Sequence, residues 1–193
     1  MISIIDYGAG NISSIKNALN FLGEKNKVVS NPEDIKSADK IIFPGVGSFG
    51  YMMQELNKKG LANAIKKAIA KGTPYLGICL GLQALFEESE ESPGIKGLGI
   101  FKGKVVKFTK GKIPQIGWNK IIPKKDNIFT NSYVYFVNSY YVTPENKDII
   151  ATTTEYYKEF TSAIQYKNIT AVQFHPEKSG NKGIELLRRW LKC

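Results

Sequence analysis

The sequence predicts an α/β protein in which a central, mostly parallel β-sheet is flanked by helices and carries appended antiparallel strands. Up to about residue 90, short β-rich runs alternate with helical hydrophobic periods, an order typical of parallel strands joined by crossover helices. From residue 100 to residue 172 the β-rich runs lie closer together, which favours antiparallel pairing. The 193 residues show no repeat or linker, so we expect one domain spanning residues 1–193.

The first half of the chain contains the predicted parallel strands. Four apolar runs are typical of buried strands, and they cover residues 1–5, 28–29, 41–43 and 75–78. Apolar residues at helical spacing predict helices over 12–22, 61–69 and 80–86. Asn11 is expected to cap the first helix and Gly23 to end it.

The second half changes character. Turns are expected at 110–111, at Pro123 and at 144–146. The chain is expected to close with a helix whose apolar residues share one face, namely Ile184, Leu187, Trp190 and Leu191.

The composition is that of an ordinary globular protein, with 42% hydrophobic and 23% charged residues, and it excludes a disordered chain. No apolar run reaches about 18 residues and the first residues lack the pattern of a secretory signal, so neither a membrane span nor export is expected. The net charge is +10, but 25 of the 27 basic residues are lysines. Readers of base edges rely on arginine, so we interpret the lysines as a solvated surface rather than a nucleic-acid site.

The cysteine and histidine counts restrict the chemistry further. Cys79 and Cys193 are the two cysteines and His175 is the single histidine. Two cysteines make no disulfide framework, which indicates a reducing, cytoplasmic setting. These residues do not build a typical structural zinc site, so no metal is expected.

The segment Gly77-Ile78-Cys79-Leu80-Gly81 lies between a predicted strand and a predicted helix. It has the form G-x-C-x-G, the thiol version of a nucleophile elbow. Small neighbours permit the sharp turn, and the start of the following helix favours a thiolate. The alternative interpretation is a buried cysteine between two tight-turn glycines.

The single histidine lies in Gln173-Phe174-His175-Pro176-Glu177. A lone histidine is more often structural than catalytic. This one follows a β-rich run, and Glu177 is close enough in sequence to accept a ring N–H and orient the imidazole. If Cys79 is a nucleophile that uses a histidine base, His175 is the only candidate.

A third segment, Pro44-Gly45-Val46-Gly47, follows the third predicted strand. Loops at the carboxyl end of a parallel strand can aim backbone N–H groups at a developing oxyanion. By itself the tetrapeptide is a weak signal, because similar turns end many strands.

Together these motifs resemble the class I glutamine amidotransferases, and within them the glutaminase subunits of imidazole glycerol phosphate synthase. The resemblance runs from 4–11 to 175–180, so it covers nearly the whole chain, and 117–119 and 135–137 narrow it to that subfamily. It implies a flavodoxin-like amidotransferase fold and an enzyme that needs no cofactor.

The resemblance implies that glutamine is hydrolysed through a glutamyl thioester. Cys79 attacks the side-chain amide, His175 moves the protons and Glu177 orients His175. The implied oxyanion donors are the backbone N–H groups of Val46, Gly47 and Leu80. The implied glutamine-binding residues are Gly47, Gln83, Glu91, Tyr135 and Ser139. Without the resemblance, the acidic run 87–91 would be interpreted as a solvated face.

The resemblance also implies a partner, a cyclase subunit with a (β/α)₈ barrel that receives the ammonia in a heterodimer. The implied interface residues are Asn11, Ser14, Gln115, Trp118, Asn119 and Asn138. Trp118 would be an interface anchor, or alternatively a core tryptophan. Gln115 and Asn138 occupy positions where the family usually has histidine.

Those two departures leave the pathway open. The first hypothesis is histidine biosynthesis, where the cyclase makes imidazole glycerol phosphate and an aminoimidazole carboxamide ribotide. The alternative is a paralogue that supplies ammonia for amidino-sugar formation in surface-polysaccharide biosynthesis. Two further classes are a catalytically inactive scaffold and a protease-like cysteine hydrolase. The motif residues around Cys79 and His175 argue against the first, and Gln83 and Glu91 argue against the second.

Eight lysines and no acidic residue lie between residues 102 and 125. We expect this strip either to meet an acidic partner surface or to be a solvated hairpin.

Overall fold

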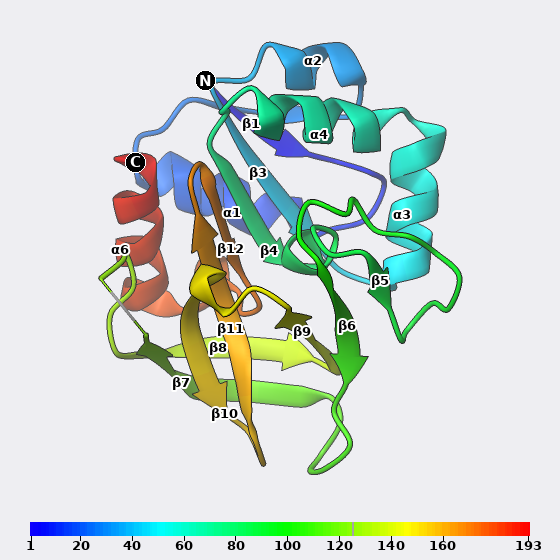
Figure 1. Ribbon diagram of the computed structural model, residues 1–193. Helices are drawn as coiled ribbons and strands as arrows, with labels where there is room; N and C mark the ends of the chain where they lie inside the picture. Colours follow the sequence, from blue (N-terminus) through cyan, green and yellow to red (C-terminus); the bar gives the residue numbers. More distant parts are fainter. Residues whose placement is uncertain (125) are drawn as a thin grey trace.

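The computed structural model, shown in Figure 1, describes residues 1–124 and 126–193. Its strands are β1 (Ile2–Ile5), β2 (Asn26–Val29), β3 (Lys40–Gly45), β4 (Tyr75–Cys79), β5 (Glu88–Ser89), β6 (Gly103–Lys107), β7 (Gln115–Pro123), β8 (Ser132–Asn138), β9 (Tyr140–Pro144), β10 (Ile150–Glu155), β11 (Glu159–Tyr166) and β12 (Ile169–Val172). Its helices are α1 (Ile12–Phe21), α2 (Pro32–Lys36), α3 (Phe49–Lys58), α4 (Leu61–Ala70), α5 (Leu80–Gln83) and α6 (Gly180–Leu191), with 3₁₀ turns η1 (Lys147–Ile149) and η2 (Pro176–Lys178).

The described strands form one mixed sheet. Its parallel part has the order β2-β1-β3-β4-β12. The antiparallel part continues from β12 through β11, β10, β7 and β8. A branch leaves β11 through β9 to β6 and β5. The predicted α/β class, a parallel core with appended antiparallel strands, is therefore confirmed.

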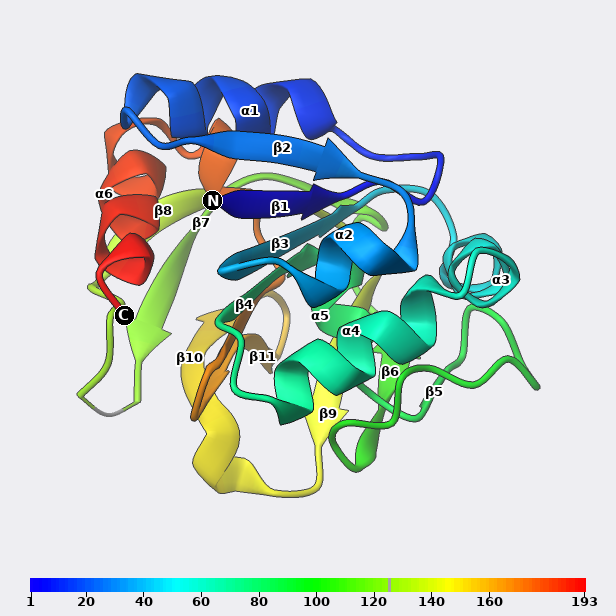
Figure 2. The same cartoon turned by 90° about the horizontal axis from the view of Figure 1, so that it is seen from above.

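Helices cover both faces of the parallel strands, and Figure 2 shows α1 and α6 on one side and α2 and α4 on the other. Successive residues of a strand point to opposite faces. On β3, Ile41 and Phe43 belong to the core cluster that contains the apolar residues of α3 and α4, whereas Ile42 belongs to the cluster of α1 and α6. Both faces of the strand are buried, which explains its continuous apolar run.

The structure differs from the prediction for the helix over 80–86. The helix α5 ends at Gln83. The carbonyl groups of residues 84–86 then accept hydrogen bonds from the amides of Leu98, Gly99 and Ile100 instead of continuing the helix. A contact between segments that are distant in sequence therefore replaces the last helical turn.

One further prediction about helices is corrected, and one helix was missed. Asn11 precedes α1, but its side chain accepts no hydrogen bond from the helix backbone, and its Oδ1 instead accepts one from Ser14 Oγ at 2.8 Å. The helix α3 was not predicted; it begins after Ser48, whose hydroxyl accepts a hydrogen bond from the Tyr51 amide at 3.4 Å. Gly23 follows the end of α1 with a φ of +77°, as a helix stop does.

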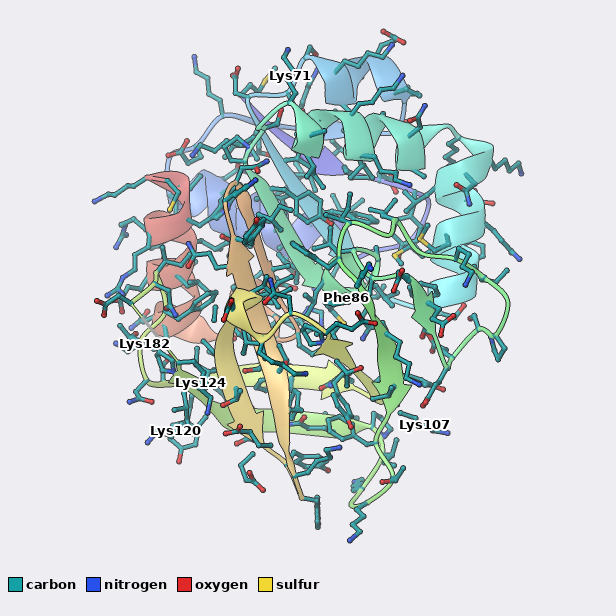
Figure 3. The ribbon with its side chains drawn as sticks, in the orientation of Figure 1. Lys71, Phe86, Lys107, Lys120, Lys124 and Lys182 are labelled. Carbon is teal, nitrogen blue, oxygen red and sulfur yellow. The ribbon has the colours of Figure 1, made fainter. Side chains whose placement is uncertain are left out.

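The lysines between residues 102 and 125 do not form one continuous strip. Lys104 and Lys107 lie on β6, and Lys120 lies on β7. Figure 3 shows Lys107 on the opposite side of the molecule from Lys120 and Lys124. An acidic partner would therefore meet two separate lysine groups. Lys125, which also belongs to the sequence run, lies outside the described residues.

In residues 1–124 and 126–193, the structure contains no helix of the length and apolarity that crossing a membrane requires.

Candidate active site

Cys79 lies at a sharp turn between β4 and α5. Its φ of +55° is in the left-handed region, which is strained for a residue other than glycine. The two flanking glycines permit the turn. A Cβ on Gly77 would lie 2.5 Å from the Gly81 carbonyl oxygen, and a Cβ on Gly81 would lie 1.9 Å from the Phe43 carbonyl oxygen. The backbone therefore approaches itself too closely for any other residue at these two positions.

His175 and Glu177 follow β12, next to β4 in the sheet. The Nδ1 atom of His175 lies 2.8 Å from Glu177 Oε1. Because the carboxylate can only accept, Nδ1 carries a proton and Nε2 is the nitrogen left for other chemistry. Both side chains are nearly fully buried.

The backbone of His175 is tied to β8. Its amide donates to the Tyr135 carbonyl at 2.9 Å, and its carbonyl accepts from Ser179 Oγ at 2.6 Å. The same hydroxyl oxygen accepts from the Tyr135 amide at 2.9 Å. Sequence reasoning did not single out Ser179, because its position only two residues after Glu177 gave no sign of a bridge to β8.

The pKa of the His175 imidazole reflects two opposing effects. Burial lowers this pKa, but hydrogen bonds to Cys79 and Glu177 and the negative charge of both groups raise it, with a net increase to about 10. The raised pKa of His175 favours an imidazolium beside the Cys79 sulfur, and the species that attacks in such a pair is the thiolate.

Because His175 is the only histidine, a single imidazole signal in an NMR titration measures its pKa directly. We expect a value well above 6.5 in the wild-type chain and a lower one in Glu177→Gln, which keeps the shape but loses the charge. The raised folded-state pKa means that the protonated imidazole stabilises the fold below about pH 6.5, and that this contribution is lost as the pH rises towards 10. An unchanged titration in Glu177→Gln would contradict this account.

A cavity of about 290 Å³ lies against Cys79 and His175. Among the residues singled out from the sequence, its lining includes Val46, Gly47, Leu80, Gln83, Glu91, Asn138 and Ser139. Pro114, Val137, Tyr140 and Lys178 complete the lining and were not predicted. The structure thus brings together segments from β3, β4, β8 and the end of β12 around one space.

Tyr135 is not part of this lining. Its ring packs edge-on against the ring of Trp118, with ring centroids 6.1 Å apart. The expectation that the Tyr135 side chain binds glutamine is therefore not supported, because the side chain lies on the outer face of the β7–β8 pair. Its backbone instead positions His175.

The loop after β3 is held by a buried tyrosine. The Val46 amide donates to Tyr7 Oη at 3.1 Å, and this hydroxyl donates to the Val46 carbonyl at 2.7 Å. Burial raises the pKa of Tyr7 to about 12, so it remains a neutral hydroxyl. The Val46 N–H is therefore not free to bind an oxyanion in this conformation, contrary to the expectation. The Leu80 N–H begins α5, where an amide has no partner within its helix.

Two polar side chains that line the cavity have defined partners. Glu91 Oε2 accepts a hydrogen bond of 2.7 Å from the amide of Phe49, so the carboxylate also caps α3. Gln83 Nε2 donates to the Tyr140 carbonyl at 3.3 Å and to Gln173 Oε1 at 3.1 Å. Gln83 Oε1 has no hydrogen-bond partner within the described part of the chain. This oxygen is itself buried, so the cavity does not expose it to a bound molecule.

The residues expected at a partner interface divide between two faces. Trp118 is 56% exposed on the outer face of β7, beside the exposed Ile116 and Tyr133. Gln115 and Asn138 are buried and lie opposite each other across β7 and β8. They cannot contact a partner directly, and this corrects the prediction. The cause is the alternation of side chains along a strand, which directs Gln115 and Trp118 to opposite faces.

The other expected interface residues are partly exposed. The Asn119 side chain donates from Nδ2 to the Glu155 carbonyl at 2.8 Å, and its Oδ1 accepts from the backbone N–H of Lys120 at 2.7 Å. Asn11 and Ser14 are bonded to each other at the start of α1, at the edge of the sheet where β1 and β4 end.

The chain matches the family model described as "Glutamine amidotransferase class-I" over residues 3–192. It is 49% identical over 195 residues to the "Imidazole glycerol phosphate synthase subunit HisH" of Pyrococcus furiosus, with 98% of this chain and 97% of that protein aligned. It is 48% identical to the chloroplastic "Imidazole glycerol phosphate synthase hisHF" of Arabidopsis thaliana, over 99% of this chain and 34% of that protein. A solved structure of a glutamine amidotransferase has a TM-score of 0.81 to this chain at 18% identity, covering 99% of this chain and 97% of the other. This last similarity concerns the fold, and it agrees with the amidotransferase fold expected from the sequence.

Proposed function

Because the chain belongs to the class I glutamine amidotransferase family, we propose that it is the glutaminase subunit of imidazole glycerol phosphate synthase and acts in histidine biosynthesis. The single observation that carries this function is the arrangement at the cavity. The Cys79 sulfur interacts with His175, and His175 in turn is bonded to Glu177. This is the order of nucleophile, base and orienting carboxylate that amide hydrolysis requires.

In the first half of the reaction, the Cys79 thiolate attacks the side-chain amide carbon of glutamine. The tetrahedral intermediate then collapses, and the C–N bond breaks. The imidazolium of His175 gives its proton to the departing nitrogen, so ammonia leaves and a glutamyl thioester remains on Cys79. The raised pKa of His175 keeps this proton available at neutral pH.

In the second half, a water molecule attacks the thioester. His175, now neutral, takes a proton from the water, the C–S bond breaks, and glutamate is released. The Glu177 carboxylate orients the ring and stabilises the imidazolium each time it forms. The sum of the two halves is glutamine plus water giving glutamate plus ammonia.

The cavity lining supports glutamine as the substrate. Glu91 places a carboxylate where it can meet the ammonium group of an amino acid. Gln83, Gly47 and Ser139 line the same cavity. Tyr135 has no part in this binding model.

The proposed partner is a cyclase subunit with a (β/α)₈ barrel that receives the ammonia. Free ammonia would be protonated in water and would lose its nucleophilicity, so direct transfer makes chemical sense. The exposed outer face of β7 and β8, with Ile116, Trp118 and Tyr133, offers an apolar contact surface beside the cavity. The Arabidopsis relative is long enough to hold a second unit in the same chain.

The alternative, ammonia supply for amidino-sugar formation, has less support. It was suggested by Gln115 and Asn138, which differ from the histidines usual in the family. Both residues are buried and do not reach the outer face, so they do not select a partner by direct contact. Relatives aligned along nearly the whole chain, among them the one from Pyrococcus furiosus, carry the name of imidazole glycerol phosphate synthase.

The test is glutamate release from glutamine, measured with and without the cyclase subunit and a ligand of its active site. Strong stimulation by this cyclase is the expected result. Stimulation only by a cyclase-like protein from a polysaccharide pathway would refute the assignment to histidine biosynthesis.

The Tyr7 hydroxyl gives a prediction about the reaction without a partner. In Tyr7→Phe the Val46 peptide loses both of its side-chain bonds and can turn its N–H towards an oxyanion. One such donor is worth about 10²–10³ in rate, so we expect the basal rate of glutamate release to rise by about tenfold. Tyr51→Phe is the matched control, because Tyr51 is half exposed on α3. An unchanged or lower basal rate in Tyr7→Phe would show that the bond to Val46 does not limit the reaction.

A further inference from the structure

Gln173 is a fully buried residue directly after β12, and neither the sequence motifs nor the proposed reaction gives it a role. The parallel register of β12 and β4 pairs Val172 with Ile78. Gln173, the residue after Val172, therefore lies next to Cys79, the residue after Ile78. The Gln173 side chain extends towards the neighbouring strand, and its Nε2 lies 3.5 Å from Cys79 Sγ.

The orientation of the Gln173 amide follows from its neighbours. The Tyr140 carbonyl can only accept a hydrogen bond, so the Gln83 atom that faces it at 3.3 Å must be the NH₂ group. The same NH₂ group lies 3.1 Å from Gln173, which must therefore present its oxygen there. This leaves the Gln173 NH₂ group facing the sulfur, to which it can only donate. The Tyr140 carbonyl thus sets the orientation of the Gln83 amide, and the Gln83 amide sets the orientation of the Gln173 amide.

We propose that Gln173 is a hydrogen-bond donor to the nucleophile, which stabilises the Cys79 thiolate and holds its sulfur in the position for attack. The inference rests on the proposed function, since it concerns the thiol that would attack glutamine. An N–H donor favours the charged form of its acceptor, and charge-assisted bonds are stronger than neutral ones. The bond is shielded from water because Gln173 is fully buried.

The relay also connects the sulfur to the cavity. Gln83 lines the cavity, and its NH₂ group donates to Gln173 Oε1. Gln83 therefore links the wall of the cavity, through Gln173, to the Cys79 sulfur.

A substitution of Gln173 leaves the titratable side chains around the Cys79 sulfur in the sequence. His175 faces it from the end of β12, with Glu177 behind the imidazole. Tyr7 faces it from the turn after β1. Glu91 and Lys178 line the same cavity. A change in thiol reactivity on replacing Gln173 therefore reports the loss of its N–H donor.

The experiment measures the rate at which iodoacetamide alkylates Cys79 across a range of pH. The full chain carries Cys193→Ser, because Cys193 is exposed and would also react. In Gln173→Met we expect the rate at neutral pH to fall about tenfold and the midpoint of the pH profile to move upward, since a donor to the thiolate is lost. Gln173→Glu keeps the shape almost unchanged but cannot donate when ionised, so it should show the same direction of change even if the methionine variant folds poorly.

The matched control is Gln165→Met on β11, where the side chain is partly exposed and the backbone pairs with Thr170. It should alkylate like the parent chain. A folded Gln173→Met or Gln173→Glu variant with the parent's rate and profile would overturn the proposal, as would an equal fall in Gln165→Met. If Gln173 only supported the fold, its substitution would lower the thermal stability and leave the pH profile of alkylation unchanged. Alkylation needs neither glutamine nor a partner, so a wild-type chain that fails to hydrolyse glutamine even with the cyclase subunit refutes the proposed function without deciding this test.

Discussion

Replacing Cys79 with alanine abolishes glutamine hydrolysis and leaves the fold intact. The substitution removes the only atom that can form the thioester, whereas the backbone turn depends on Gly77 and Gly81 and on their close approach to neighbouring carbonyl groups. Loss of a nucleophile in enzymes of this type lowers turnover by about 10³-fold or more. The measurement is glutamate release in the presence of the cyclase subunit, with thermal unfolding followed by circular dichroism.

Cys193→Ala is the matched control, since it makes the same substitution at the other, exposed cysteine. It should hydrolyse glutamine at the wild-type rate. Turnover near the wild-type rate in Cys79→Ala would remove the basis for the proposed thioester. A smaller loss is expected for Glu177→Gln, because that change removes orientation and charge and leaves the base in place.

Replacing Trp118 with alanine weakens the association between this chain and its cyclase partner by about 30-fold or more. Trp118 is 56% exposed although it is among the largest apolar side chains, and its ring is supported by the edge of Tyr135. A rigid aromatic residue in the middle of an apolar face is typical of an interface anchor, whose truncation costs about 2 kcal/mol or more. By the affinity relation this is a factor of about 30 in Kd.

The measurement is the dissociation constant of the two subunits by calorimetry or by sedimentation. Phe21→Ala is the control, because Phe21 is 76% exposed at the far end of α1, on the edge of the sheet opposite the cavity. Equal Kd values for wild type and Trp118→Ala would show that the partner does not bind over the outer face of β7 and β8. The core-tryptophan alternative is already wrong, because a core side chain would be buried.

The sequence by itself determined the fold class, the buried parallel strands and the identity of the reacting residues. The strands over residues 1–5, 41–43 and 75–78 were predictable because a strand buried on both faces is a continuous apolar run. The turn at Cys79 was predictable because two glycines flank the cysteine in the sequence. The structure requires both, since a Cβ on Gly77 would meet the turn itself and a Cβ on Gly81 would meet strand β3. His175 was predictable because it is the single histidine and is followed closely by Glu177.

Local sequence patterns did not predict the end of a helix where its backbone bonds to residues far away in the chain. The helix over 80–86 was predicted too long because its last turn is replaced by bonds to residues 98–100. The helix α3 was not predicted, although Phe49, Met52, Met53 and Leu56 have helical spacing. This spacing was a signal that could have identified it.

Only the tertiary structure decided which groups of the site are occupied and which are free. The bond between Val46 and Tyr7 joins residues 39 positions apart, and the bond between Gln173 and Cys79 joins residues 94 positions apart. Periodicity in a sequence reports which face of an element is buried, because burial repeats along that element. It carries no information about which hydrogen-bond partner folding brings from a distant strand, and these partners decide the state of the Val46 amide, the Cys79 sulfur and the Gln83 oxygen.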